Sequence, residues 1–422
     1  MKISIEALTR VEGEGKLELY YKEGKLERLM LCIYEPPRFI EGILKGKPYH
    51  VIPDITARIC GICPVAYQMS GVKAIEMAFG VSLTEEINKA RKLMYFGEWI
   101  QSHALHIFFL HLPDFYQVPS VVELAKTQKE LVLAGMEIKR VGSLIIQELG
   151  GRTSHPVSVV AGGFSHLPED LSSLIEPLEK ALEKALWVSE RLKELDFPTF
   201  ELDLPFLSLY DEEDYPILEG VLFFEGQKLR VEEFKRHFVE FQVPYSNAKH
   251  STTKDRRVYL TGPLARFNNA FDKLNPTAKE LAKKLGIEPP LKNPYKSLLV
   301  RLVEIVHAIE GALDLVRQYK KPERVRLEVF PKASEGFGAT EAPRGLLWHH
   351  YRFDDEGRIT FADIVPPTSQ NQGAMERALF VLLDQQNLAQ EERIRDSAEA
   401  MIRNFDPCIS CATHFLKVRR HV

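Results

Sequence analysis

The apolar and polar positions near the N-terminus follow the pattern of β-strands and predict a hairpin. Its two strands cover residues 16–21 and 27–34, and the turn between them, Lys22-Glu23-Gly24-Lys25, contains a glycine. Further strands are predicted closer to the C-terminus, at residues 324–330, 348–353 and 358–364. The last two are joined by Asp354-Asp355-Glu356-Gly357, which again has the composition of a turn.

From about residue 84 the apolar positions change to the helical period. Residues 171–192 show it most clearly, because leucines and small residues recur there every three or four positions. Two more helices are predicted at residues 87–112 and 121–149, and they end at Pro113 and at Gly150-Gly151, respectively. A further helix is predicted at 298–319, and one helix or two at 374–405.

Together these elements predict an α+β fold that is predominantly helical and has small antiparallel β regions. The regular alternation of strands and helices that marks a doubly wound sheet is absent. The sequence contains no repeat, low-complexity tract or long linker, so we expect a single domain over residues 1–422. The irregular stretch 197–244 is the one candidate for a subdomain boundary.

Composition excludes several classes of protein. The formal net charge is -4, from 55 basic and 59 acidic residues, so the basic excess of a nucleic-acid-binding protein is missing. The N-terminus has no apolar segment of a signal peptide, and the most apolar stretch, residues 104–112, is too short to span a membrane. We therefore expect a soluble, cytoplasmic protein that binds neither nucleic acid nor membrane.

Cysteine spacing is the strongest chemical signal in the sequence. Four of the five cysteines form two Cys-x-x-Cys pairs, Cys60 with Cys63 and Cys408 with Cys411, while Cys32 is expected to be a lone buried thiol. Four thiolates suit a zinc site, an iron–sulfur cluster or another soft redox metal, and two separate redox dithiols are a further alternative. Zinc ribbons keep their pairs about 15–20 residues apart. Here the gap spans nearly the whole chain, which favours a catalytic centre.

The residues around both pairs resemble the signature motifs of nickel–iron hydrogenase large subunits. The first is Arg58-Ile59-Cys60-Gly61-Ile62-Cys63, and the second is Asp406-Pro407-Cys408-Ile409-Ser410-Cys411 followed by His414. Further segments of the same family occur in register from residue 9 to residue 414. They are Thr9-Arg10-Val11-Glu12-Gly13, Ser102-His103-Ala104-Leu105-His106, Gly150-Gly151-Arg152-Thr153-Ser154-His155-Pro156, Glu341-Ala342-Pro343-Arg344-Gly345 and Val365-Pro366-Pro367-Thr368. Within the family, the sequence is most similar to the alpha subunits of soluble archaeal NADP-linked sulfhydrogenases.

This resemblance implies a nickel–iron centre held by the four paired cysteines. All four bind nickel: Cys60 and Cys408 are terminal ligands, whereas Cys63 and Cys411 also bridge to an iron that carries one carbonyl and two cyanides. A structural magnesium is implied at Glu41 and His414; a carboxylate oxygen suits magnesium better than an imidazole does.

The resemblance also implies a catalytic role for several residues outside the ligand set. Arg344 lies over the open face of the metals, where its guanidinium bonds a cyanide and polarises dihydrogen. Thr368 and the backbone near Pro366 hold the other cyanide, and Asp406 pairs with Arg344 or fixes its surroundings. The implied reaction is reversible heterolytic cleavage of dihydrogen, with the proton passing from Cys408 to Glu12.

Two positions depart from the family pattern. Tyr67 stands where the first motif often carries a histidine, and Ser102 stands where an aspartate often precedes the histidine. The family's hydrogen bonds at these two positions are therefore not carried over. His103 and His106 lie three residues apart on a predicted helix and are interpreted as core histidines rather than as a second metal site.

Electron transfer requires partner subunits, because Cys32 alone remains and cannot hold an iron–sulfur cluster, and no GxGxxG motif for a nucleotide follows a strand. The family implies an iron–sulfur small subunit, further iron–sulfur subunits and a subunit that binds FAD and NADP, together a cytoplasmic heterotetramer that could also reduce sulfur. In this family a maturation protease often removes the tail after the histidine that follows the second cysteine pair, which here is His414, so the tail would be residues 415–422. The rival interpretations are a scaffold subunit related to complex I, which generally lacks the nickel cysteines, and a zinc-stapled structural protein.

Overall fold

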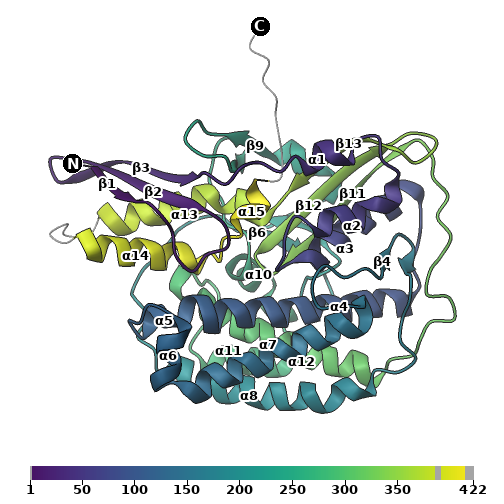
Figure 1. The fold of residues 1–422 in the computed structure, drawn as a ribbon, viewed down its shortest axis with the longest axis horizontal. Coiled ribbons are helices and arrows are strands. Elements are labelled where there is room, and N and C mark those ends of the chain that lie inside the picture. Colours follow the sequence, from purple (N-terminus) through teal and green to yellow (C-terminus); the bar gives the residue numbers. More distant parts are fainter. Residues whose placement is uncertain (1, 385–390, 414–422) are drawn as a thin grey trace, which may run out of the picture.

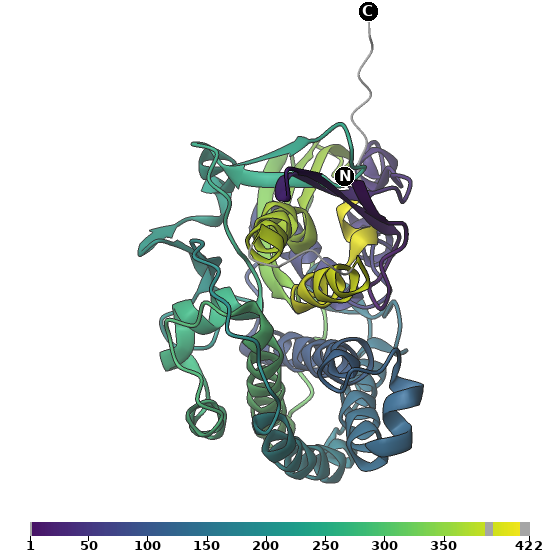
Figure 2. The same ribbon diagram turned by 90° about the vertical axis from the view of Figure 1, so that its left-hand side faces the viewer.

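The computed structural model describes residues 2–384 and 391–413 and arranges them as a helical layer below a β-rich layer (Figure 1). The helical layer is built from long helices that pack on one another. They are α4 (Glu85–Ala104), α7 (Lys129–Gly150), α8 (Ile175–Lys193), α11 (Pro276–Lys284) and α12 (Ser297–Arg317). The view turned by 90° shows the two layers as separate halves joined along one side (Figure 2). The predicted α+β fold with predominant helix is confirmed.

Capping residues mark the start of α4 and the end of α7. The side chain of Thr84 accepts a hydrogen bond from the backbone N–H of Ile87 and so caps α4. Helix α7 ends at Gly151, whose φ of 80° is a left-handed conformation that glycine adopts without steric cost. Helix α12 is buried on almost every side, and its buried residues include Arg301, Glu304 and His307 among the apolar ones.

Two predicted helices are wrong in detail. The helix expected at 87–112 ends as α-helix at Ala104, continues as a π-helical segment over Leu105–His111, and runs past Pro113 in α5 (Leu112–Phe115). Proline is tolerated there because it occupies the first turn of α5, where its missing N–H has no helical partner. The helix expected at 121–149 is divided at Gln128 into α6 (Val121–Thr127) and α7.

The β-rich layer is organised around an antiparallel sheet in the order β11-β12-β13, formed by Ser334–Ala342, Gly345–Phe353 and Ile359–Val365. Strand β11 was not predicted, because its glycines and acidic residues do not form an apolar alternation. The glycines have a packing function: a Cβ at Gly336 would lie 2.0 Å from the Ala74 carbonyl oxygen, and one at Gly338 would lie 2.1 Å from that of Ser70. The sheet can therefore lie directly against α3 (Pro64–Phe79), the helix that follows Cys63.

A second antiparallel sheet at the N-terminus has the order β1-β2-β3, formed by Lys2–Ile5, Gly15–Lys22 and Lys25–Ile33. The predicted hairpin is confirmed. Glu23 and Gly24 form its turn, with φ values of 50° and 78°, and the positive φ at both central residues matches the right-handed twist of the two strands. Cys32 in β3 is buried, as expected.

Residues 197–244 contain short strands rather than only irregular chain. They are β6 (Leu207–Tyr210), β7 (Val221–Phe224), β8 (Gln227–Leu229) and β9 (Phe238–Gln242), the last paired with β10 (Lys249–Thr253). The strand predicted at 324–330 is wrong. That segment makes only an isolated bridge, with hydrogen bonds from Phe164 N to Val325 O and from Leu327 N to Gly162 O.

The described C-terminal part consists of α13 (Pro367–Asp384), α14 (Glu391–Asn404) and the short α15 (Ile409–Ala412). It returns to the N-terminal sheet and to the turn before α3 (Figure 1). None of the described helices is both long and apolar enough to cross a bilayer.

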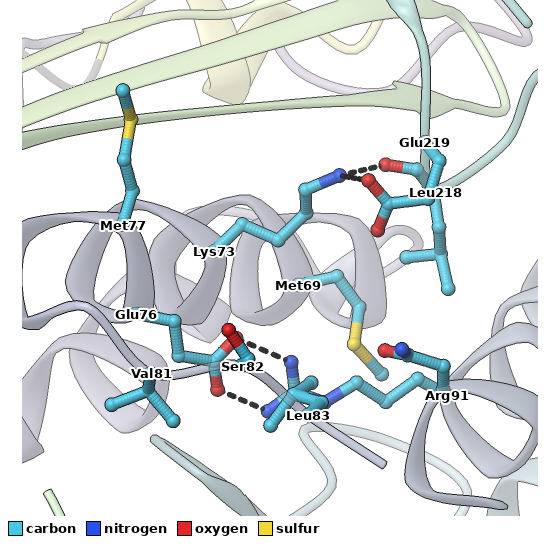
Figure 3. Close-up of a pocket in the computed structure, with 11 residues that line it drawn as sticks. Met69, Lys73, Glu76, Met77, Val81, Ser82, Leu83, Arg91, Leu218 and Glu219 are labelled. Atoms are coloured by element: carbon cyan, nitrogen blue, oxygen red, sulfur yellow. Dashed lines mark hydrogen bonds and ion pairs between the residues drawn. The ribbon is translucent and has the colours of Figure 1, made fainter. Parts of the chain in front are cut away.

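A polar cavity of about 370 Å³ lies between α3, α4 and the loop at Leu218–Glu219 (Figure 3). Its buried carboxylate, Glu76, accepts two hydrogen bonds from Arg91, at 2.7 and 2.8 Å, and one from the backbone N–H of Gly162. Lys73 is bound to Glu219 at 2.7 Å. Apart from the Nε of Arg91, which has no partner among the described residues, these charged groups are paired with one another, and no predicted site residue lines the cavity.

Candidate metal centre

The two cysteine pairs meet at the junction of the layers although Cys60 and Cys408 are 348 residues apart in the chain. Cys60 and Cys63 lie in the turn between α2 (Ile52–Ala57) and α3, and Pro64 starts α3 directly after Cys63. Cys408 immediately precedes α15, and Cys411 lies within it. Each pair is thus carried by the start of a helix, which fixes the direction of both thiols.

All four thiols are buried, and their sulfur atoms lie within 4.8 Å of one another. The Sγ–Sγ distance is 2.8 Å within each pair and 3.4 Å between Cys60 and Cys408. All five cysteines of the chain are free thiols. In the described part of the chain, this is the one group of three or more cysteine, histidine or carboxylate side chains arranged to hold a metal ion.

The electrostatics of the pocket fit a bound cation. Burial alone would raise the pKa of the Cys60 thiol, but hydrogen bonds with the other three thiols and the charge of Arg344 lower it well below its usual range. Burial and the neighbouring thiols hold the pKa of Cys408 well above its usual range. Burial opposes the ionisation of four adjacent thiols, and Arg344 is the positive charge that lies beside them. A multivalent soft metal would add further positive charge.

Arg344 and Asp406 form a buried pair beside the thiols. Arg344 donates from Nε to the Asp406 backbone oxygen at 2.8 Å and from Nη2 to Asp406 Oδ1 at 3.1 Å. Burial opposes the charge of the guanidinium, but Asp406 and the nearby thiols hold its pKa well above the usual value. Its Nη1 is buried and has no hydrogen-bond partner among the described residues. Arg344 thus brings an unused N–H donor to the pocket.

Glu12 is tied directly to the second cysteine pair. Its backbone forms a parallel bridge with Cys408, and its carbonyl oxygen accepts a hydrogen bond from Ile409 N at 3.0 Å. Its carboxylate accepts hydrogen bonds from the backbone N–H of Ser410, at 3.0 Å, and from the Ser410 hydroxyl. The carboxylate is therefore held at the start of α15 by Ser410, the residue between Ile409 and Cys411 of the second pair.

Thr368 and Pro366 lie on the other side of Cys408, at the start of α13. The backbone N–H of Cys408 donates to Thr368 Oγ1 at 3.1 Å, which leaves the threonine O–H available as a donor. The Pro366 carbonyl oxygen accepts a hydrogen bond from the Ser369 hydroxyl at 2.9 Å. Both residues are buried near the thiols, and their predicted contact with cyanide stays a prediction.

The predicted magnesium ligands are only partly described. Glu41, in α1 (Ile40–Leu44), accepts a hydrogen bond from Ile364 N at 3.0 Å and lies 4.0 Å from the Lys249 ammonium group. His414 lies outside the described residues. The described chain thus offers one hard oxygen ligand at this position, and magnesium stays a prediction.

The residues at the two departures from the family pattern are both buried. The Tyr67 side chain projects from the first turn of α3, and its pKa is raised well above the usual range by burial and by the thiols of Cys411, Cys63 and Cys60. Ser102 is fully buried in α4. The predicted core histidines are buried too: His103 Nε2 lies 2.9 Å from Glu304, and His106 Nε2 lies 2.7 Å from the Arg403 carbonyl oxygen.

Two residues that hold the cysteine segments were missed in the sequence. Glu98, fully buried in α4, accepts hydrogen bonds from Val65 N at 2.6 Å and Ala66 N at 3.0 Å, so it caps the start of α3 from a neighbouring helix. Arg38, before α1, donates to carbonyl oxygens next to both cysteine pairs. Neither residue belongs to a recognisable motif; their partners follow only from the folded structure.

The chain is similar to hydrogenases over nearly its whole length. A family model described as nickel-dependent hydrogenase matches residues 38–141 and 236–414. The alpha subunits of sulfhydrogenase 2 and sulfhydrogenase 1 of Pyrococcus furiosus are 34% and 33% identical, over 99% of this chain and 100% and 99% of theirs. The matching vhu polypeptide of an F420-non-reducing hydrogenase of Methanocaldococcus jannaschii is 31% identical over 90% of this chain and 97% of its own.

Solved structures agree with this comparison. An NAD+-reducing NiFe hydrogenase in the H2-reduced state superposes with a TM-score of 0.87 and 27% identity, covering 98% of this chain and 99% of that one. The Ni-Fe-Se hydrogenase of Desulfomicrobium baculatum has a TM-score of 0.77 and 23% identity, over 98% of this chain and all of its own. At 23% identity, the similarity to the Desulfomicrobium baculatum enzyme supports the fold alone.

Proposed function

The chain belongs to the nickel-dependent hydrogenase family as the catalytic large subunit of a nickel–iron hydrogenase, and from that premise we propose how its own residues carry out the reaction. The observation that carries the proposal is the group of four buried thiols beside Arg344. We propose that Cys60, Cys63, Cys408 and Cys411 bind nickel and that Cys63 and Cys411 also bind iron. When bound, the metal pair supplies the electrophilic centre at which dihydrogen is polarised and its electrons are taken up.

The protein supplies the base and the fixed charge. In the proposed mechanism the Cys408 sulfur accepts the proton and the Glu12 carboxylate, held at the start of α15 by Ser410, takes it onward. Arg344 stabilises the developing negative charge from a direction that Asp406 fixes through two hydrogen bonds. Burial of the thiols keeps water out, so these charges act at low dielectric.

The same proposal includes the carbonyl and cyanide ligands of the iron and a separate magnesium site. Thr368 and the Pro366 backbone would hold one cyanide of an iron that carries a carbonyl and two cyanides, while the free Nη1 of Arg344 would donate to the other. Glu41 and His414 would bind magnesium. The single domain over residues 1–422 and the processing tail at 415–422 also stay predictions; the tail lies outside the described residues.

We propose an electron route through partner subunits. The described part of the chain has no second cysteine cluster, so electrons would pass to an iron–sulfur small subunit, then to iron–sulfur and flavin subunits that bind FAD and NADP. The two sulfhydrogenase alpha subunits that resemble this chain support such an assembly and a capacity to reduce sulfur. A heterotetramer in the cytoplasm, matured by a protease, is the form that we expect.

Hydrogen-dependent reduction by the native complex tests this proposal. We expect the nickel-containing complex to reduce an artificial dye under hydrogen, and to reduce NADP⁺ faster than NAD⁺ when all subunits are present. Nickel analysis of each fraction is the control, since dye reduction should follow nickel content. A nickel-loaded complex that reduced no dye would contradict the hydrogenase function. Dye reduction without NADP⁺ reduction would contradict only the NADP link.

A further inference from the structure

The side chain of Arg38 connects the two segments that carry the cysteines. Its guanidinium donates from Nη2 to the Ile59 carbonyl oxygen at 2.6 Å and to the Ser410 carbonyl oxygen, and from Nη1 to the Arg58 carbonyl oxygen at 3.3 Å. Ile59 directly precedes Cys60, and Ser410 directly precedes Cys411. One partly buried side chain therefore links backbone next to both pairs.

The backbone around Arg38 strengthens this connection. Its own N–H donates to the Thr413 carbonyl oxygen at 2.8 Å, so the residue also holds the end of the described C-terminal segment. The next residue, Phe39, has a φ of 56°, a left-handed conformation that costs free energy for a bulky side chain. The strained residue directly follows the one that makes these contacts, so the contacts of Arg38 help to hold this backbone conformation.

Arginine is suited to this position by its geometry. Its planar guanidinium offers five N–H donors in a fixed fork, so it can reach carbonyl oxygens on two segments at once. A lysine would bring one compact ammonium group on a flexible stem. The two segments must approach from opposite ends of the chain, and hydrogen bonds from a charged donor are stronger than neutral ones.

We infer that Arg38 is a latch, a positioning residue that holds the two cysteine pairs together and slows release of the metal. The inference rests on the proposed function, because it needs the four cysteines to bind nickel. This positioning role is separate from the proposed catalytic mechanism, because Arg38 touches no reacting atom and acts only through the backbone of the segments that carry the cysteines.

Nickel release from the native complex tests the latch. The variants Arg38→Ala and Arg38→Lys are compared with wild type and with Arg28→Ala, which removes an exposed arginine of β3 far along the chain from both pairs. Each complex is incubated with a chelator, and nickel remaining in the protein is measured over time. We expect release from Arg38→Ala to be about tenfold faster, the effect of losing one charge-assisted hydrogen bond. Arg38→Lys should be intermediate, and Arg28→Ala should match wild type.

Each result of the nickel-release experiment either supports or overturns the proposed role of Arg38. Equal release rates in Arg38→Ala and wild type would overturn the latch, whereas a wild-type complex without nickel would overturn the proposed function instead. If Arg38→Ala is isolated without nickel, the unfolding temperatures of the metal-free variant and metal-free wild type are compared. Equal temperatures would support the latch as a requirement for closing the site. A lower temperature in the variant would assign Arg38 to general stability and overturn the inference.

Discussion

Replacing Glu12 with glutamine is expected to leave the metals in place and to lower hydrogen turnover by about 10³-fold, within the range for loss of a general acid–base group. The amide oxygen of glutamine can still accept the hydrogen bond from Ser410 N, so the start of α15 should keep its position. The amide cannot accept a proton from Cys408 at neutral pH. Turnover should therefore fall while nickel content stays at the wild-type value.

The measurement for Glu12→Gln combines nickel analysis, hydrogen-dependent dye reduction and exchange of dihydrogen with D2O. Glu6→Gln is a matched control, because Glu6 is an exposed carboxylate near the same end of the chain. Full nickel content with normal proton exchange in Glu12→Gln would remove Glu12 from the proton route. Loss of nickel would instead show that the contacts of Glu12 with Ser410 are needed for assembly.

Replacing Arg344 with lysine is expected to preserve metal content and to lower turnover by about 10²- to 10³-fold, as for the loss of one charge-stabilising donor. The present arginine uses Nε and Nη2 to hold Asp406 and keeps Nη1 for the pocket. A lysine retains the positive charge but cannot satisfy Asp406 and face the metals in one fixed plane. The loss should therefore appear in the chemical step rather than in nickel binding.

Dye reduction and nickel content measured together test this variant. Arg352→Lys is the control, because Arg352 is an exposed arginine of β12 that pairs with Glu335 on the surface. Turnover close to wild type in Arg344→Lys would remove the guanidinium from the mechanism.

Each cysteine pair can be recognised in the sequence because its signal is local, and the fold brings the two pairs together. Each Cys-x-x-Cys pair lies in one short motif, so spacing alone shows that two thiols point into one pocket. The N-terminal hairpin is predictable for the same reason, since its turn residues are adjacent. In contrast, β11 was missed because Gly336 and Gly338 are required by contact with α3, a helix that lies more than 250 residues earlier in the chain.

Some features of the structure depend on contacts between distant parts of the chain, and these features could not be predicted from the sequence. The π-helical segment at Leu105–His111 follows an apolar pattern that also suits a regular helix. Glu98 and Arg38 resemble ordinary surface charges in the sequence, and only the folded chain shows that their partners are backbone groups next to the cysteines. Such residues have no short-range signal, because the groups that they bind are brought together by tertiary structure.

The infrared spectrum of the anaerobically purified native complex tests the central claim, that the four cysteines hold a nickel–iron centre with diatomic ligands. We predict one carbonyl band and two cyanide bands in a sample that contains nickel. A sample with stoichiometric zinc and none of these bands would contradict the account and assign the four cysteines to a structural zinc site.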